Sequence, residues 1–151
     1  MLDAYLQHVA EREKLCIPPK PLSPEQVAEL VHILQRSENA ANELLLDLIT
    51  NCVPPGVDQA AYVKAGFLSS LARGEEACVL VDREHAIRLL GNMHGGYNIG
   101  TLIQLLDDPK YGYSAARELK KTLLVFDAFH DVATCAKRGS LPAQEVLESW
   151  A

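Results

Sequence analysis

The chain has 151 residues and a mass of 16.6 kDa, which is the size of one domain. Its residues are 48% hydrophobic and 23% charged, which is ordinary globular usage and argues against a disordered or fibrous chain. The formal net charge of −6 argues against nucleic acid as a partner, because binding a phosphate backbone requires a basic surface.

Membrane and export signals are missing from the sequence pattern. No apolar run approaches the 18 or so residues of a membrane span, and the first residues do not resemble a secretory signal. The four cysteines are widely spaced and form no CxxC pair: Cys16, Cys52, Cys78 and Cys135. We therefore expect reduced thiols in a cytoplasmic protein, although dispersed ligands could still assemble a zinc site.

Nearly every segment follows a helical period, beginning with an N-terminal helix and a proline-rich linker over residues 1–22. The apolar face of this first helix comprises Leu2, Tyr5, Leu6 and Val9. The next helix begins at Ser23, where Pro24 suits the first helical position and Gln26 completes a capping box. Its predicted inward residues are Val27, Leu30, Val31 and Leu34.

The sequence predicts further helices after residue 42, several of them with a recognisable first or last residue. A helix over 43–51 is predicted to bury Leu44, Leu45, Leu48 and Ile49. Asp58 opens a helix that ends at Gly74, with Tyr62, Val63, Phe67, Leu68 and Leu71 directed inward. Asp82 opens another helix, and Asn98 is predicted to cap the one after it. Helices over about 113–125, 127–138 and 142–150 complete the chain.

These helices are predicted to form consecutive antiparallel pairs over 43–73, 83–107 and 112–138. Units of 30–40 residues with two helices each are typical of an α-solenoid. We therefore predict an all-α fold of eight or nine helices in a single domain, residues 1–151, with the helix pairs over 23–151. Residues 102–109, which end in Asp-Asp-Pro, and the alanine-containing segment 115–119 resemble a HEAT repeat.

The usual signatures of enzymes are absent, and no catalytic residue is predicted. The five histidines are scattered over different helices, where each is more simply a partly exposed helix residue: His8, His32, His85, His94 and His130. The serines lack a glycine elbow, and the glycines at 95–96 follow no strand and precede no Lys-Ser/Thr pair.

Two turns carry more glycine and proline than helix packing requires. The first includes Pro54, Pro55 and Gly56; the second is Gly95, Gly96, Tyr97 and Asn98. The second turn places backbone amides beside a helix start, where an anion is favoured. A tight turn between helices, with an enclosed tyrosine, is the simpler interpretation, and ligand binding is the alternative.

Many segments, in order, resemble the N-terminal HEAT-like domain of the bacterial aconitase B family, over essentially the whole chain. They include residues 8–12, 19–22, 45–48, 53–58 leading into 60–68, 86–87 with 89–91, 95–99, 123–124 with 126–127, and 149–151. The sequence departs from the usual family residues at Cys52, His94 and Gly100, where arginine, glutamine and histidine are common.

The resemblance implies an α-solenoid that packs beside catalytic domains, helps to line the route to their active site, and takes part in dimerisation and other protein contacts. In this family, citrate and isocitrate are interconverted by a [4Fe–4S] cluster whose cysteines lie far beyond the N-terminal domain. We therefore predict a domain for protein interaction or self-association, with no cofactor, metal or catalytic residue in this chain. The alternatives are an excised part of an active aconitate hydratase, with the two turns lining the substrate channel, and a metal sensor that brings Cys52 to His94.

Overall fold

The computed structural model describes residues 1–36, 42–122 and 128–151. In these residues the chain forms nine α-helices, one short 3-10 helix and no strand, which confirms the predicted all-α fold class. The helices are α1 (Leu2–Lys14), α2 (Pro24–Arg36), α3 (Glu43–Asn51), α4 (Gln59–Arg73), α5 (Arg83–Gly91), α6 (Ile99–Gln104), η1 (Leu105–Asp107), α7 (Gly112–Leu119), α8 (Phe129–Lys137) and α9 (Leu141–Trp150).

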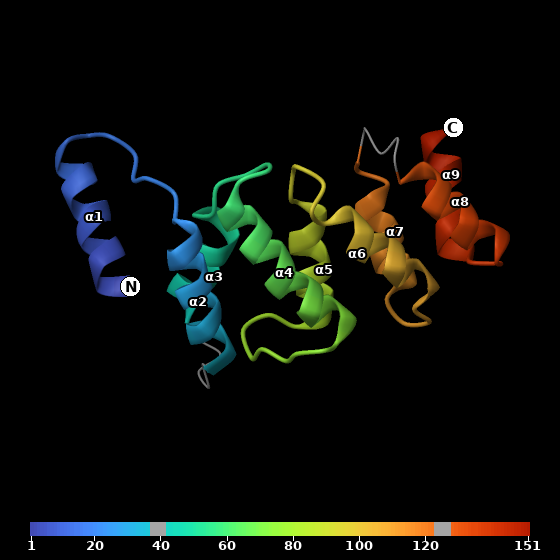
Figure 1. Ribbon diagram of the computed structural model, residues 1–151, viewed down its shortest axis with the longest axis horizontal. Helices are drawn as coiled ribbons and strands as arrows, with labels where there is room; N and C mark the ends of the chain where they lie inside the picture. Colours follow the sequence, from blue (N-terminus) through green and yellow to red (C-terminus); the bar gives the residue numbers. More distant parts are fainter. Residues whose placement is uncertain (37–41, 123–127) are drawn as a thin grey trace.

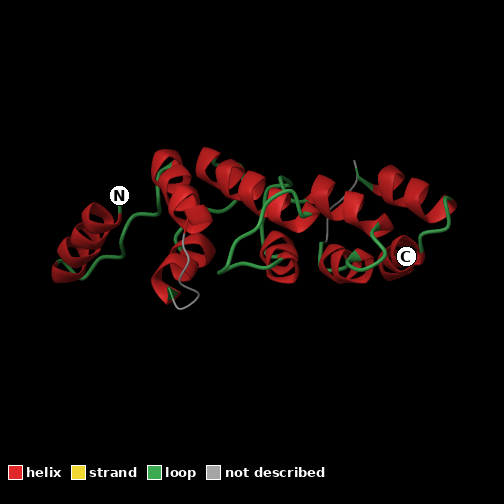
Figure 2. Ribbon diagram, turned by 90° about the horizontal axis from the view of Figure 1, so that it is seen from below, coloured by secondary structure: helices red, strands yellow, loops and turns green. Residues whose placement is uncertain are grey.

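The helices follow one another along the long axis of the molecule, with α1 at one end and α8 and α9 at the other (Figure 1). Seen from below, they lie in two rows (Figure 2). The main contacts join α4 to α5, α2 to α4, α8 to α9, α5 to α7 and α7 to α9. The core therefore runs lengthwise between the rows.

The predicted pairing of helices is wrong by one position. The segments 43–73, 83–107 and 112–138 were expected to form pairs, which would join α3 to α4, α5 to α6 and α7 to α8. The extensive contacts between neighbouring helices instead join α4 to α5, α6 to α7 and α8 to α9, whereas α2 with α3 and α5 with α6 make only small contacts. Sequence periodicity identifies an apolar face but not the neighbour that covers it, so the pairing could be displaced without altering the helices themselves.

The predicted helix starts are confirmed for α2, α4 and α5. Ser23 and Gln26 form a reciprocal capping box, in which the Gln26 Oε1 accepts from the Ser23 N–H at 2.9 Å and the Ser23 Oγ accepts from the Gln26 N–H at 3.3 Å. The Asp58 and Asp82 carboxylates accept from backbone N–H groups at the starts of α4 and α5, at 2.8 and 2.7 Å. Gly74 ends α4 in the left-handed conformation, as predicted.

Three residues predicted to face inward are exposed: Leu6, Leu44 and Tyr62. The helices α1 and α3 bury narrow stripes, of which Tyr5 is the buried member in α1 and Leu45, Leu48 and Ile49 are those of α3. Leu6 immediately follows the buried Tyr5, and Leu44 immediately precedes the buried Leu45. Consecutive residues differ by about 100° around a helix, so both leucines lie outside the stripe. Tyr62 instead contacts Tyr97 on the surface.

The C-terminal third follows the prediction in part. The Asp-Asp-Pro segment ends η1, and Asp108 Oδ1 accepts from the N–H groups of Lys110 and Tyr111 at 2.8 and 2.9 Å. Ala115 and Ala116 are fully buried, as expected for small residues at a close helix contact. However, α7 ends at Leu119 rather than near 125. Residues 123–127, which belong to the predicted helix ends and to the family resemblance, lie outside the described residues.

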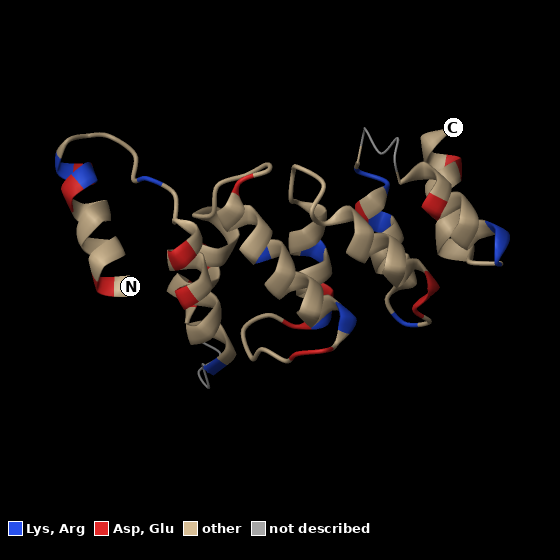
Figure 3. Ribbon diagram, viewed as in Figure 1, with Lys and Arg blue, Asp and Glu red and all other residues tan. Residues whose placement is uncertain are grey.

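In the described residues, Lys and Arg occur on helices and turns from α1 to the loop between α8 and α9 (Figure 3). Among the residues that the structure describes, no helix combines the length and the apolar character needed to cross a bilayer.

Candidate binding pocket at two glycine turns

The two turns identified in the sequence contact each other. Gly56 has φ 82°, and Gly95 has φ 98°. A Cβ atom on Gly95 would lie 2.4 Å from the carbonyl carbon and oxygen of Gly56, so the two backbones are in direct contact. The Tyr97 hydroxyl donates to the Val57 carbonyl at 3.1 Å, which ties the second turn to the first. Glycine is required at position 95 by both the backbone conformation and this close approach.

Asn98 does not cap α6 with its side chain as predicted. It occupies the N-cap position in a helical backbone conformation, and its side chain makes no capping hydrogen bond. Its Nδ2 instead donates to the Leu90 carbonyl at 2.6 Å, and its side chain is buried. The buried Oδ1 of Asn98 has no hydrogen-bond partner. Asn98 thus attaches the second turn to the end of α5 rather than starting α6.

A pocket of about 250 Å³ lies beside the first turn, between the ends of α3, α4 and α5. Its walls combine apolar and polar side chains: Thr50, Asn51, Val53, Pro54, Pro55, Gly56, Ala61, Lys64, Leu89, Asn92, Met93 and His94. Three of the predicted turn residues therefore line it, namely Pro54, Pro55 and Gly56. Gly95, Gly96, Tyr97 and Asn98 do not line it, but Gly95 and Tyr97 contact the first turn beside it.

Lys64 is the functional candidate that sequence reasoning missed. Its side chain lies on α4 with only 8% of the residue exposed, and Nζ donates to the Thr50 carbonyl at 3.0 Å. Burial lowers the pKa of Lys64 to about 8, and the nearby Cys52 opposes this shift. The signal was present in the sequence, since Ala61, Lys64, Leu68 and Leu71 follow the spacing of a buried helix face.

Tyr5 of α1 lies beside Cys52, close to this pocket. Burial raises the pKa of Tyr5 to about 12, and the adjacent Cys52 thiol contributes in the same direction. The Tyr5 hydroxyl donates to the Lys20 carbonyl at 3.2 Å, and the Lys20 N–H donates to the His8 Nε2 at 3.0 Å. The linker between α1 and α2 is thereby folded back onto α1.

The cysteines do not gather into a metal site. Cys16 is exposed and Cys135 is buried, while Cys52 and Cys78 are half-buried at separate places in the fold. The Cys78 thiol faces the Leu34 carbonyl at 3.5 Å, and burial raises the pKa of the Cys135 thiol. Over residues 1–36, 42–122 and 128–151, no three His, Cys, Asp or Glu side chains are placed to hold a metal ion. These residues therefore do not fit an iron–sulfur cluster, nor do they bring Cys52 and His94 into such a group.

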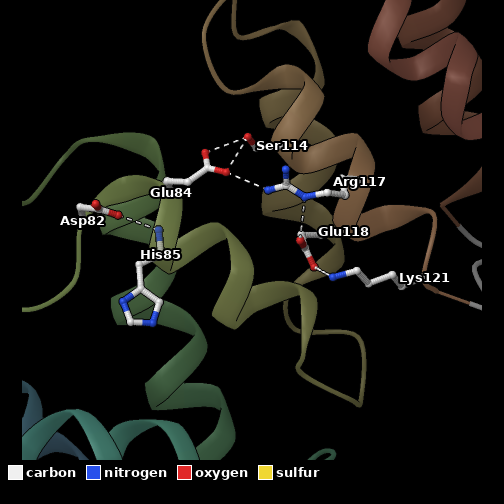
Figure 4. Close-up of polar contacts among 7 residues, drawn as sticks. All are labelled: Asp82, Glu84, His85, Ser114, Arg117, Glu118 and Lys121. Carbon is white, nitrogen blue, oxygen red and sulfur yellow. Dashed lines mark hydrogen bonds and ion pairs between the residues drawn. The ribbon is translucent and has the colours of Figure 1, made fainter. Parts of the chain in front are cut away.

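A second polar cluster joins α5 to α7 and is drawn in Figure 4. The Glu84 carboxylate accepts from the Ser114 hydroxyl at 2.9 and 2.7 Å and from Arg117 at 2.8 Å. Burial disfavours the ionised form of Glu84, but the hydrogen bonds from Ser114 and Arg117 outweigh it and lower the pKa. Arg117 also contacts Glu118, which pairs with Lys121 on its other side. Glu84, Arg117, Glu118 and Lys121 each have an oppositely charged partner, as in a structural contact between helices.

The described residues thus form a helical domain of two rows, with a small pocket beside a pair of glycine turns. The chain belongs to the family described as the aconitate B N-terminal domain, whose model matches residues 4–151. This finding confirms the resemblance noted in the sequence.

The relatives are much longer proteins than the region that matches this chain. The chain is 56% identical over 151 residues to an aconitate hydratase B of Pseudomonas aeruginosa and 54% identical to one of Escherichia coli. It is 49% identical over 153 residues to an aconitate hydratase B of Synechocystis. Each comparison covers 100% of this chain but only 17% or 18% of the relative. The chain therefore spans less than a fifth of the length of these relatives.

Proposed function

We propose that this chain is a HEAT-like interaction domain of the aconitase B type, which contributes protein contacts and no catalytic residue. Its family membership supports the type of protein, and its two rows of helices support a HEAT-like organisation. Repeated helix pairs of this kind generally offer extended surfaces to protein partners.

One exposed surface carries the proposal. Val57 is 73% exposed and Tyr62 is 60% exposed, although both are large apolar side chains. The rings of Tyr62 and Tyr97 meet edge to face with centroids 5.3 Å apart, and the Tyr97 hydroxyl is bonded to the Val57 carbonyl. We call Val57, Tyr62 and Tyr97 the tyrosine surface. Grouped, rigid aromatic side chains of this sort are enriched at protein interfaces.

Self-association is the first contact to test. Sedimentation equilibrium of the purified chain should reveal a dimer, and Tyr62→Lys should weaken it by about tenfold or more because it places a charge in an apolar contact. Tyr113→Lys is the matched control, since Tyr113 is also exposed but lies on α7.

A second measurement tests a contact with the rest of an aconitase-B-type protein. The chain is added to the part of the Pseudomonas aeruginosa relative that lies outside the matched region, and binding is followed by calorimetry. The interaction role would be contradicted if the chain neither self-associated nor bound in this experiment. It would also be contradicted if Tyr62→Lys left the association unchanged.

The alternative function is that of a channel wall in an active aconitate hydratase. It is favoured by the names of the relatives, which are aconitate hydratases B, and by the pocket that Pro54, Pro55 and Gly56 line. The size of the polypeptide in its source cells distinguishes the two cases, since a species much larger than 16.6 kDa would assign the chain to a longer enzyme. The purified chain alone should form no cis-aconitate, and turnover by it would overturn the proposed lack of catalytic residues.

The cytoplasm is the proposed compartment, in keeping with free thiols and the absence of disulfides among the four cysteines. The metal-sensing alternative receives no support from the described residues, because they form no group of three ligands.

A further inference from the structure

Lys64 holds a positive charge in the interior without an acidic neighbour. No ion pair joins Lys64 to a carboxylate in the described ranges, where its one hydrogen bond goes to the Thr50 carbonyl. An ammonium group has three N–H donors, so two of them are left for another acceptor. A buried charge that lacks a partner costs free energy, and a residue kept at such a cost is a candidate for function.

The pocket beside Lys64 has the chemistry of an anion site. Its polar lining residues other than Lys64 are Thr50, Asn51, Asn92 and His94, and neither Asp nor Glu lines it. Hydroxyl, amide and imidazole groups can all donate hydrogen bonds to an oxyanion. Val53, Leu89 and the two prolines supply apolar walls that strengthen an electrostatic contact by excluding water.

We propose that this pocket binds a small oxyanion, a carboxylate or a phosphate, with the ammonium group of Lys64 as its counter-charge. The volume of about 250 Å³ is below the range of drug-sized ligands, which restricts the occupant to a few non-hydrogen atoms around its charged group. None of the residues of the tyrosine surface lines this pocket, so anion binding can be tested independently of the interaction role.

The protonation state of Lys64 suits this role. Because its pKa is about 8, Lys64 is mostly charged at neutral pH, and a bound anion would stabilise the charged form further. Above pH 8 binding should therefore be accompanied by proton uptake. The other titratable groups near Lys64 are Cys52, which lies at the end of α3, and His94, which lines the pocket from beyond the end of α5. Proton uptake must be assigned to Lys64 by substitution.

The experiment titrates the purified chain with inorganic phosphate and, separately, with malonate at low ionic strength. Amide chemical shifts report where each probe binds, and calorimetry in two buffers of different ionisation enthalpy reports proton uptake at pH values just above 8. At least one probe should bind, with shifts concentrated at residues 50–56 and 92–94. The probe that binds more tightly identifies the phosphate or the carboxylate class.

Three variants make the result specific. Lys64→Met should lower the affinity about tenfold or more and abolish proton uptake, since a charge-assisted hydrogen bond is lost. Lys137→Met removes the same charge from an exposed position on α8 and should leave binding unchanged. Asn92→Asp changes only an exposed position at the pocket wall and should also weaken binding, by repelling the anion, without altering the buried residues. Binding of neither probe, or equal affinity in Lys64→Met and the wild type, would overturn the proposal.

Discussion

Two buried charges on different helices are treated in opposite ways by the fold. Glu118 on α7 is 1% exposed and lies between Arg117 and Lys121, both of which provide a positive charge. Lys64 on α4 is 8% exposed and contacts a carbonyl oxygen instead of a carboxylate. A buried charge with its own partners is a structural element, whereas one that faces a pocket without a partner retains its capacity to bind.

The surroundings of the two charges reinforce this difference. Gly91 on α5 leaves room for Glu118, because a Cβ atom there would lie 2.6 Å from the Glu118 Cβ and 2.2 Å from Oε2. The carboxylate is thus packed against a helix and is closed off. Lys64 by contrast lines an opening whose rim is kept in shape by the contact between Gly56 and Gly95. The glycines serve close packing in one region and the shape of a pocket in the other.

Substitution at the rim of the pocket should have the largest effect on stability. Gly95→Ala forces a left-handed backbone on alanine and drives its Cβ into the backbone of Gly56, so we expect a loss of about 2–4 kcal/mol. Gly96→Ala is the control, because Gly96 also has a positive φ of 90° but nothing lies within 4 Å of its Cβ position. Urea unfolding followed by circular dichroism measures both. Equal losses in the two variants would show that the turns are not pressed together.

Removal of the unpartnered charge should stabilise the protein. Lys64→Met keeps the volume of the side chain and removes the cost of burying an ammonium group, which should raise the free energy of unfolding by about 1–3 kcal/mol at neutral pH. The folded pKa of about 8 lies below the value of 10.5 expected for the unfolded chain, so the unfolded state binds more protons between these limits.

Wild-type stability should therefore rise as the pH increases from about 8 to 10.5, by the linkage between proton binding and folding. The Lys64→Met variant should lack this particular rise, and the difference between the two proteins should shrink over the same interval. Thermal unfolding across this pH range measures the effect. A constant difference between the two proteins would mean that Lys64 keeps its ordinary pKa in the folded state.

The smallest effect on stability is expected at Gly91, which packs against the buried carboxylate of Glu118. Gly91→Ala should cost about 1–2 kcal/mol, because the new methyl group displaces Glu118 from its position against α5. Gly66→Ala is the helical control, since no atom lies within 4 Å of its Cβ position and alanine favours a helix. Gly66→Ala should be neutral or stabilising in the same urea experiment. A Gly91→Ala variant as stable as Gly66→Ala would show that the α5–α7 contact is loosely packed.

Local sequence signals predicted the helices well, because each depends on residues close together in the chain. The capping residues Ser23, Asp58 and Asp82 start their helices as expected, and Gly74 ends one. The prediction that Asn98 caps α6 was wrong because its side-chain amide donates to the end of α5 instead. Only the tertiary fold places that carbonyl acceptor within reach. A cap residue can be recognised from sequence, but a competing partner cannot.

The candidate site shows the same division. The prolines and glycines predicted both turns, because proline restricts the backbone φ angle and glycine permits a positive one. That the turns touch, and that Lys64 lies behind them, depends on contacts across up to 40 residues, such as that of Tyr97 with Val57. Lys64 was overlooked because lysine is seldom buried, even though its spacing from Leu68 and Leu71 placed it on the inner face of α4.

The pattern of contacts between helices also has a mechanical consequence. Most of the extensive contacts join helices that are neighbours or next neighbours in the chain. Few long loops must then close before native contacts form, which favours rapid folding that can begin in more than one place. A force applied to the two ends, where α1 and α9 lie, would separate the helices in succession instead of breaking every contact at once. The order of contacts along the chain therefore predicts stepwise rather than all-or-none separation of the helices when the two ends are pulled apart.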